Sequence, residues 1–259
     1  MPCPGSRLAK LFFEIQYTLR PLTRELRRKL VIACSALAPA FVAAAPNEIK
    51  VFTDELARYR EHTLEVHVNK ASSAGPKAED QRTPLQIMPE YSYGIRRNWE
   101  ISLQLPLAFD QGTSRLDGYR AELQYVAPHA EDEGFYWGFN AELARNERSG
   151  EEAFWSAELI PILGYRVRRW HFVANPGVDK QLSGSSRATN FQPAAKLAYQ
   201  AFGWNEFGLE YYGGDRSRVL YIAWDGRIGK SDFNVGIGRG FTDESDRWVL
   251  KMIFEFAFR

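Results

Sequence analysis

The sequence contains very little cysteine. Of its 259 residues only two are cysteines, Cys3 and Cys34, and both lie in the first 44 residues. The rest of the chain therefore has no disulfide framework and no thiolate metal site. No H-E-x-x-H pattern occurs either, so the sequence predicts neither a metal site nor a cofactor.

Long apolar runs are also missing. No segment after residue 45 has 18 consecutive apolar residues, which argues against a helical membrane protein. Charged residues make up 25% of the chain, and its mean hydropathy is -0.38. Both values remain compatible with a membrane β-barrel, because half of each barrel strand faces water.

An excess of positive charge is absent from most of the chain. The formal net charge is +1, but residues 1–44 carry seven Lys or Arg and two Asp or Glu, a net of +5. The remaining residues therefore carry a net charge of -4. This balance argues against a nucleic-acid-binding surface.

The first 44 residues have the order of a secretion signal. A basic stretch at residues 24–29 precedes an apolar run at residues 30–45, and the run ends in small residues. This order predicts a signal peptide with an N-terminal extension over residues 1–44, cleaved after Ala44. The alternatives are an uncleaved membrane anchor and a lipid attached at Cys34.

Residues 45–62 are predicted to form a lead-in segment on the periplasmic side. Within it, Thr53–Glu61 is compatible with a short amphipathic helix or with extended chain that leads into the first strand. The sequence leaves open whether this segment plugs the structure that follows.

Apolar and polar residues alternate in twelve stretches of the remaining chain. The alternation is clearest over Trp99–Phe109 and again over Trp248–Phe258, and a period of two is typical of a strand with one apolar face. The pattern predicts an all-β fold, a transmembrane antiparallel up-and-down β-barrel over residues 63–259. The predicted strands are 63–71, 85–95, 99–110, 118–127, 135–146, 154–166, 170–181, 191–201, 205–213, 218–228, 232–241 and 247–258.

The links between these predicted strands alternate in length. Links such as 72–84 and 182–190 are long and polar, whereas links such as 96–98 and 229–231 are tight. Outer-membrane barrels have short periplasmic turns and longer extracellular loops. The alternation therefore predicts the outer membrane of a Gram-negative bacterium, and the even number of strands places both ends of the chain on the periplasmic side.

Alternation does not by itself say which face points outward. A soluble barrel of the lipocalin or avidin kind buries its apolar face inside, whereas a membrane barrel turns that face to lipid. The signal, the alternating links and the number of strands favour the membrane barrel. The polar face then lines the lumen, and the predicted pore-lining residues are Glu90, Glu100, Arg120, Glu122, Glu142, Glu158, Arg166, Lys196, Glu210, Asp225, Arg227, Lys251 and Glu255.

Aromatic residues gather near the ends of the predicted strands. Amphipathic rings prefer the headgroup layer, so a membrane barrel carries an aromatic girdle at each rim. The alternative is that aromatic residues simply favour strands. The predicted girdle residues are Trp99, Trp137, Trp170 and Trp204 on the short-turn side, and Phe109, Trp155 and Trp248 on the long-loop side.

No catalytic constellation stands out in the sequence. The four histidines are His62, His67, His129 and His171, and none has a convincing Ser and Asn partner of the kind that outer-membrane phospholipases use. We expect these histidines to be solvated or to belong to the girdles. The sequence therefore predicts no enzyme and no catalytic residue.

Three stretches carry a resemblance to a known family. They are Met88–Gly94, Trp99–Leu107 and Arg247–Phe258. Through them the mature chain resembles Gram-negative outer-membrane barrels labelled "transporter" or "MetA-pathway phenol degradation". The resemblance implies an outer-membrane barrel with a role in small-molecule uptake and supplies no catalytic residues. The last strand also resembles the aromatic-ended signal of the barrel-assembly machinery, although Arg259 follows Phe258.

The sequence favours a channel or transporter for small solutes with a polar, mixed-charge lumen. Lumen charges set the selectivity of such channels, and the acidic balance here favours cations mildly. One alternative is a non-conducting structural or surface-binding barrel, and a remote one is a lipid-modifying enzyme. The expected partners are outer-membrane lipid, the barrel-assembly machinery and an unknown small solute.

Overall fold

The computed structural model describes residues 49–72, 84–110, 112–130, 132–147, 152–214 and 217–258. Contacts between residues divide the chain into two units, residues 1–40 and residues 41–259. The first unit and the predicted signal peptide lie outside the described residues. The second unit contains every strand given below.

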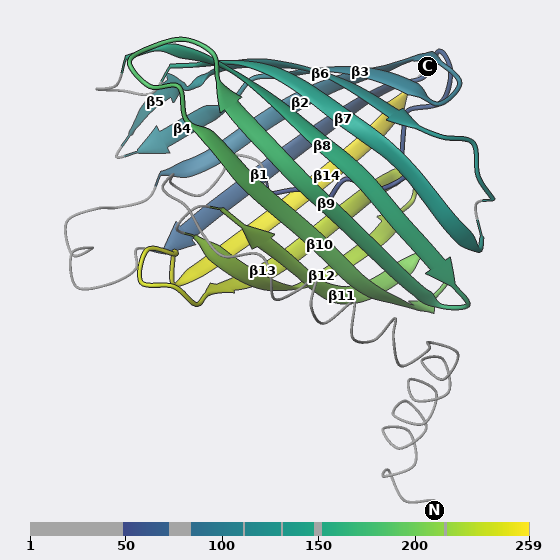
Figure 1. Ribbon diagram of the computed structural model, residues 1–259. Coiled ribbons are helices and arrows are strands. Elements are labelled where there is room, and N and C mark those ends of the chain that lie inside the picture. Colours follow the sequence, from purple (N-terminus) through teal and green to yellow (C-terminus); the bar gives the residue numbers. More distant parts are fainter. Residues whose placement is uncertain are drawn as a thin grey trace, which may run out of the picture. The chain divides into compact units, whose positions relative to one another are not determined.

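The second unit consists of antiparallel strands that form one closed barrel (Figure 1). The strands are β1 (His62–Ser72), β2 (Leu85–Arg96), β3 (Trp99–Gln104), β4 (Leu107–Asp110), β5 (Thr113–Leu116), β6 (Gly118–Val126), β7 (Gly134–Asn146), β8 (Phe154–Val167), β9 (Trp170–Gln181), β10 (Thr189–Phe202), β11 (Asn205–Gly213), β12 (Arg218–Ile228), β13 (Ser231–Gly240) and β14 (Trp248–Phe258).

These fourteen segments make twelve barrel strands. β3 and β4 are one strand interrupted at Leu105 and Pro106, and β5 and β6 are one strand interrupted at Asp117. Neighbouring strands along the chain pair with each other, and β1 pairs with both β2 and β14, which closes the barrel. The predicted twelve-stranded up-and-down barrel is confirmed. No helix in the described part of the chain is long and apolar enough to cross a membrane.

The fourth predicted strand is wrong at its beginning. It was predicted from residue 118, but the strand starts with β5 at Thr113, where β4 and β5 form a hairpin. All four residues of β5 are exposed. Both faces of β5 are therefore exposed, and its residues Thr113–Leu116 carry no apolar alternation from which a strand is predicted.

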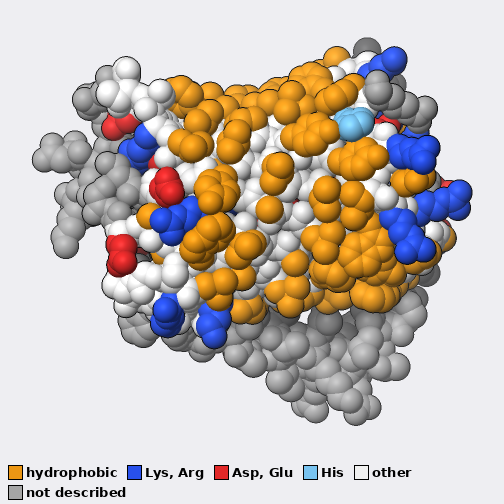
Figure 2. Space-filling model, turned by 90° about the horizontal axis from the view of Figure 1, so that it is seen from above, with side chains coloured by type: hydrophobic (Ala, Val, Ile, Leu, Met, Phe, Trp, Pro, Cys, Tyr) orange, Lys and Arg blue, Asp and Glu red, His pale blue; other side chains and the backbone are white. Residues whose placement is uncertain are grey.

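The apolar face of the strands points outward. Leu103 and Ile222 are 61% and 68% exposed, whereas residues of the opposite parity are mostly buried. Hydrophobic side chains cover the middle of the outer face, and Lys and Arg side chains gather toward its two ends (Figure 2). A contiguous apolar band of this kind is typical of a surface that meets hydrocarbon. The barrel is therefore a transmembrane barrel and not a soluble barrel with its apolar face inside.

Two prolines interrupt the ladder between β8 and β9. The register pairs residues on both sides of the interruption but none between Leu159 and Leu163, where Pro161 lies opposite Pro176. Proline has no N–H to donate, so neither residue supplies a ladder hydrogen bond. Asn175 Nδ2 donates a bond of 3.4 Å to the Pro161 carbonyl. A side chain thus replaces part of the missing backbone pairing.

One buried ring depends on a glycine in the neighbouring strand. Tyr136 of β7 lies opposite Gly164 of β8, and its side chain is only 1% exposed. A Cβ atom added at Gly164 would lie 1.9 Å from Cζ of Tyr136. The ring therefore occupies the space that any larger residue at position 164 needs.

We expect Gly164→Ala to lower the free energy of unfolding by about 1–3 kcal/mol, because it overpacks the Tyr136 ring. Denaturant unfolding in detergent or lipid vesicles measures this change. In a Tyr136→Ala background the same glycine substitution should cost much less, since the ring is gone. An equal cost in both backgrounds would show that the ring is not the cause.

Candidate functional site

The structure places most of the predicted pore-lining residues on the inner face of the barrel. Buried there are Glu90, Glu100, Glu122, Glu142, Lys196, Glu210 and Lys251. Half-buried there are Arg120, Glu158, Arg166, Asp225 and Glu255. Arg227 differs, because it is exposed at the short-turn rim, where it pairs with Asp232 and lies over the Trp204 ring. Their part in conduction remains a prediction.

Opposite charges on the inner face pair across strands. Arg120 lies 3.3 Å from Glu142, and Lys196 lies 3.3 Å from Glu206 and 3.1 Å from Asp225. Charges removed from bulk water need partners of opposite sign, and these pairs supply them. Much of the inner wall is thus a paired network of charges contributed by different strands.

Polar amides and rings extend this network. Gln104 Nε2 donates to Glu122 at 2.6 Å, and Asn140 Nδ2 donates to the same carboxylate at 3.0 Å. On another part of the wall, Tyr136 and His171 share a hydrogen bond of 2.8 Å. These bonds fix the positions of side chains for which the sequence periodicity predicts only the face of the strand.

A segment that precedes the barrel in the chain lies inside it. From here on, the lead-in segment means residues 49–58, the part of the predicted segment 45–62 that makes the following contacts. Phe52 is 4% exposed, and its backbone forms two hydrogen bonds with the Asn175 side chain, at 2.8 and 3.0 Å. Gln124 Nε2 donates to the carbonyl oxygens of Thr53 and Glu55 at 3.3 and 3.2 Å. The wall thus binds the segment partly through its backbone.

Charged side chains anchor the lead-in segment as well. Lys50 Nζ lies 2.8 Å from Glu65 Oε1. Arg166 donates to the Asp54 carboxylate from Nη1 and from Nη2, the latter at 2.8 Å. His129 Nε2 lies 2.8 Å from the same carboxylate. The sequence left open whether this segment enters the barrel, and the structure places residues 49–58 against the inner wall, where partners for their charges and their backbone lie.

Asp54 is held in its ionised form by these partners. Burial alone raises the pKa of Asp54, but the hydrogen bond and charge of Arg166 and the hydrogen bond of His129 outweigh it. The pKa therefore lies below its ordinary value of 3.8. Asp54 keeps its charge, and with it this anchor, at neutral pH.

A cavity borders the lead-in segment inside the barrel. It lies against β6, β8, β9, β10 and β11, and its lining includes Lys50, Phe52, Arg120, Glu158 and Tyr212. Charged and aromatic side chains thus share the wall of this cavity. Both charge signs are present in its lining, with Lys50 and Arg120 basic and Glu158 acidic.

Aromatic residues of the predicted girdles lie on the outer face or at its rims. Trp137, Trp204, Phe109 and Trp248 are exposed, and Trp99, Trp155 and Trp170 are half-buried. Near the short-turn rim the Trp99 ring lies 4.6 Å from that of Tyr125, and the Trp170 ring lies 5.0 Å from that of Tyr199. Whether these rings sit at the headgroup layer remains a prediction.

Two histidines were assigned wrongly from the sequence. His67 and His171 were expected to be solvated or part of a girdle, but they are 1% and 3% exposed on the inner face. His67 lies 3.2 Å from both Glu65 and Glu90. The parity of His67 was visible in the sequence, but its acidic partner on the next strand is set by the register of β1 and β2.

No family model matches the sequence, and no curated protein matches it. Among solved structures, the chain is similar to the COG4313 outer membrane channel from Pseudomonas putida F1, with a TM-score of 0.59 and 12% identity over 82% of this chain and 100% of that one. It also matches LpxR from Salmonella typhimurium, with a TM-score of 0.44 and 7% identity over 75% of this chain and 99% of that one. The first likeness shows the fold alone, and the second is too distant to support an argument. With its apolar outer band, the chain is an outer-membrane β-barrel.

Proposed function

We propose that this barrel is an outer-membrane channel for small hydrated solutes and that the lead-in segment narrows its lumen. The observation that supports this most is the charged inner face behind an apolar outer band. A polar interior of this kind is water-filled in porins and plugged in other barrels, and the cavity beside the lead-in segment favours the first. Twelve strands also enclose an interior wider than that of an eight-stranded barrel, which side chains just fill.

The proposed channel prefers cations. Of the thirteen predicted pore-lining residues, eight are acidic and five are basic. Rings of charged side chains set ion selectivity in pores, and an acidic excess favours cations. The preference is mild, because many of these charges pair with one another.

Planar bilayers test the proposal directly. The purified mature protein should give small, discrete conductance steps and a reversal potential on the cation-selective side in a KCl gradient. Persistent absence of conductance, including after removal of the lead-in segment, would favour a non-conducting structural barrel. Hydrolysis of lipid by the purified protein would instead favour the remote enzymatic alternative.

Glu158 offers a sharper test of selectivity, because it borders the cavity beside Arg120 and Lys50. We expect Glu158→Gln to lower the cation-to-anion permeability ratio by about twofold, since one lumen negative charge is lost. Asp243→Asn is the matched control, because Asp243 is an exposed carboxylate outside the strands. Equal permeability ratios in wild type and Glu158→Gln would show that the ions take another path.

The resemblance to the "transporter" or "MetA-pathway phenol degradation" barrels belongs to the same proposal. It is consistent with uptake of a small molecule, and it stays a hypothesis, since no family model matches the chain. The proposed partners are the solute, the surrounding outer-membrane lipid and the barrel-assembly machinery. None of these partners is nucleic acid.

A further inference from the structure

Three metal-ligating side chains converge on the inner wall where β1 meets β2. Glu65 and His67 are two residues apart in β1, so both point to the same side of the strand. Glu90 of β2 lies directly opposite Glu65 in the register. One ligand atom from each of the three residues lies within 4.8 Å of the others, and all three side chains are buried.

The register places like charges side by side at this point. Glu65 has Glu90 opposite it in β2 and Glu255 opposite it in β14. Like charges directly opposite each other destabilise a sheet unless a cation lies among them. A positive group placed beside this row of carboxylates therefore stabilises the sheet.

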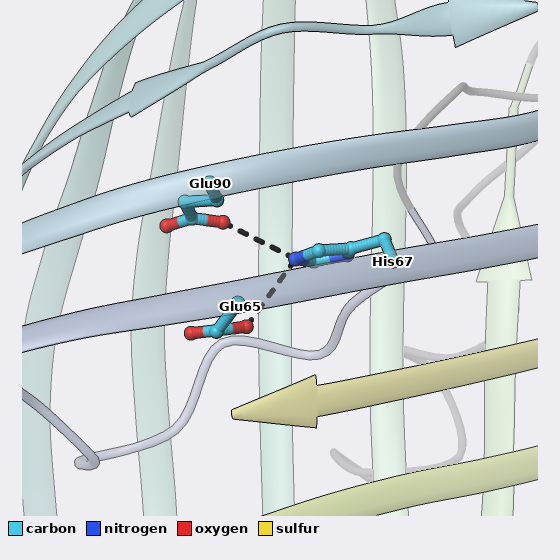
Figure 3. Close-up of side chains that lie close together, drawn as sticks. All are labelled: Glu65, His67 and Glu90. Atoms are coloured by element: carbon cyan, nitrogen blue, oxygen red, sulfur yellow. Dashed lines mark hydrogen bonds and ion pairs between the residues drawn. The ribbon is translucent and has the colours of Figure 1, made fainter. Parts of the chain in front are cut away.

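The distances around His67 resemble those of a coordination shell. Nε2 lies 3.2 Å from Oε2 of Glu65 and 3.2 Å from Oε2 of Glu90, and it points between them (Figure 3). Charge-assisted N–H···O bonds are usually shorter, about 2.7–2.9 Å. Ligand atoms of a tetrahedral site with bonds of 2.0–2.1 Å lie about 3.3 Å apart. Two of the three distances between ligand atoms thus match such a site, and the third, between the two carboxylates, is within 4.8 Å.

A cation already occupies part of this shell. Lys50 of the lead-in segment places Nζ 2.8 Å from Oε1 and 3.0 Å from Oε2 of Glu65, and 3.9 Å from Oε2 of Glu90. This ammonium comes from a segment outside the sheet, so the cluster binds a positive group that the strands themselves do not supply. The observation is independent of the ligand geometry and points to the same kind of ligand.

We propose that Glu65, His67 and Glu90 bind a divalent transition-metal ion of the zinc class, in competition with the ammonium group of Lys50. One imidazole and two carboxylates are a donor set that zinc accepts, and three protein ligands leave a fourth position for water. Ser92 and Gln104 donate to Glu90 at 3.3 and 3.2 Å, which orients this ligand from the outer shell.

This competition links ion binding to the anchoring of the lead-in segment, because Lys50 belongs to that segment. A divalent ion displaces the ammonium group of Lys50 and the proton on Nε2 of His67, which passes to water, and Lys50 then loses its ion pair with Glu65. Lys50 also lines the cavity and stands between it and the three buried ligands, so an ion from the lumen reaches the site when Lys50 moves aside. Ion binding therefore loosens the lead-in segment near its N-terminal end.

Calorimetric titration of the detergent-solubilised mature barrel with Zn²⁺ tests the site. We expect one high-affinity Zn²⁺ per barrel, and Glu90→Gln and His67→Gln should each weaken it at least about tenfold. Lys50→Met should tighten binding about tenfold, because it removes the competing cation while leaving every ligand in place. His171→Gln is the matched control, since His171 is equally buried but pairs with Glu206 on β11.

Two results would overturn the proposal. One is Zn²⁺ affinity that survives both Glu90→Gln and His67→Gln, which would place the ion elsewhere, such as at the rim histidine His62. The other is unchanged affinity in Lys50→Met, which tests the competition even if a ligand variant does not fold. The titration requires no conductance, so its outcome stands apart from the proposed channel function.

Discussion

Replacing residues 49–58 with a Gly/Ser linker of equal length should raise single-channel conductance about threefold or more, because the lead-in segment crosses the lumen and fills part of it. The segment is bound at several points, including Asn175, Gln124 and Arg166. A Gly/Ser chain offers neither the Asp54 carboxylate nor the apolar Phe52 side chain. Planar-bilayer recording at neutral pH measures the change.

The control for this replacement is a loop that does not enter the lumen. Residues 183–188 link β9 and β10, and a Gly/Ser replacement there should leave the conductance near the wild-type value. Asp54→Asn should give an intermediate result, since it removes one anchor and leaves the backbone contacts. If the variant with residues 49–58 replaced has the same conductance as wild type, the lead-in segment does not limit ion flow through the lumen.

Lys251→Met should lower the free energy of unfolding by about 3–5 kcal/mol, because it leaves Glu210 as a buried charge without its cation. Lys251 is 1% exposed and forms an ion pair with Glu210 as well as a hydrogen bond of 2.9 Å with the Tyr212 hydroxyl. Its ammonium also lies 3.4 Å from the carbonyl oxygen of Ile49. Denaturant unfolding, followed by the mobility of unheated samples on gels, measures the loss.

A double variant separates lost charge balance from lost packing. Lys251→Met combined with Glu210→Gln removes both charges and should recover most of the stability, since no uncompensated carboxylate remains. If the double variant is no more stable than the single one, the loss comes from the shape of the lysine side chain. If Lys251→Met alone unfolds like wild type, the pair does not stabilise the barrel.

The sequence predicted the wall of the barrel closely because a local rule governs it. A strand with lipid on one side and a polar lumen on the other must alternate, so the pattern over Trp248–Phe258 predicts both the strand and its outward face. The same rule failed at β5, where all four residues are exposed and no apolar face alternates with a polar one. It also found nothing in the lead-in segment, which has no sheet face to follow.

The candidate site was predicted only in part. Parity placed His67 on the inner face, but Glu90 becomes its neighbour only through the pairing of β1 with β2. The partner of Asp54 is Arg166, which lies 112 positions further along the chain. A pattern that repeats every two residues gives no information about a contact between residues so far apart in the sequence.

The amino-acid order alone determined which residues form strands and which side chains face lipid, because these depend on neighbours two positions apart. Closure of the barrel determined which residues of distant segments become neighbours. It brought β14 against β1, set carboxylates opposite one another and formed the polar interior that binds the lead-in segment. Long-range pairing has this role because charges and backbone groups withdrawn from bulk water are stable only where partners from distant strands meet them.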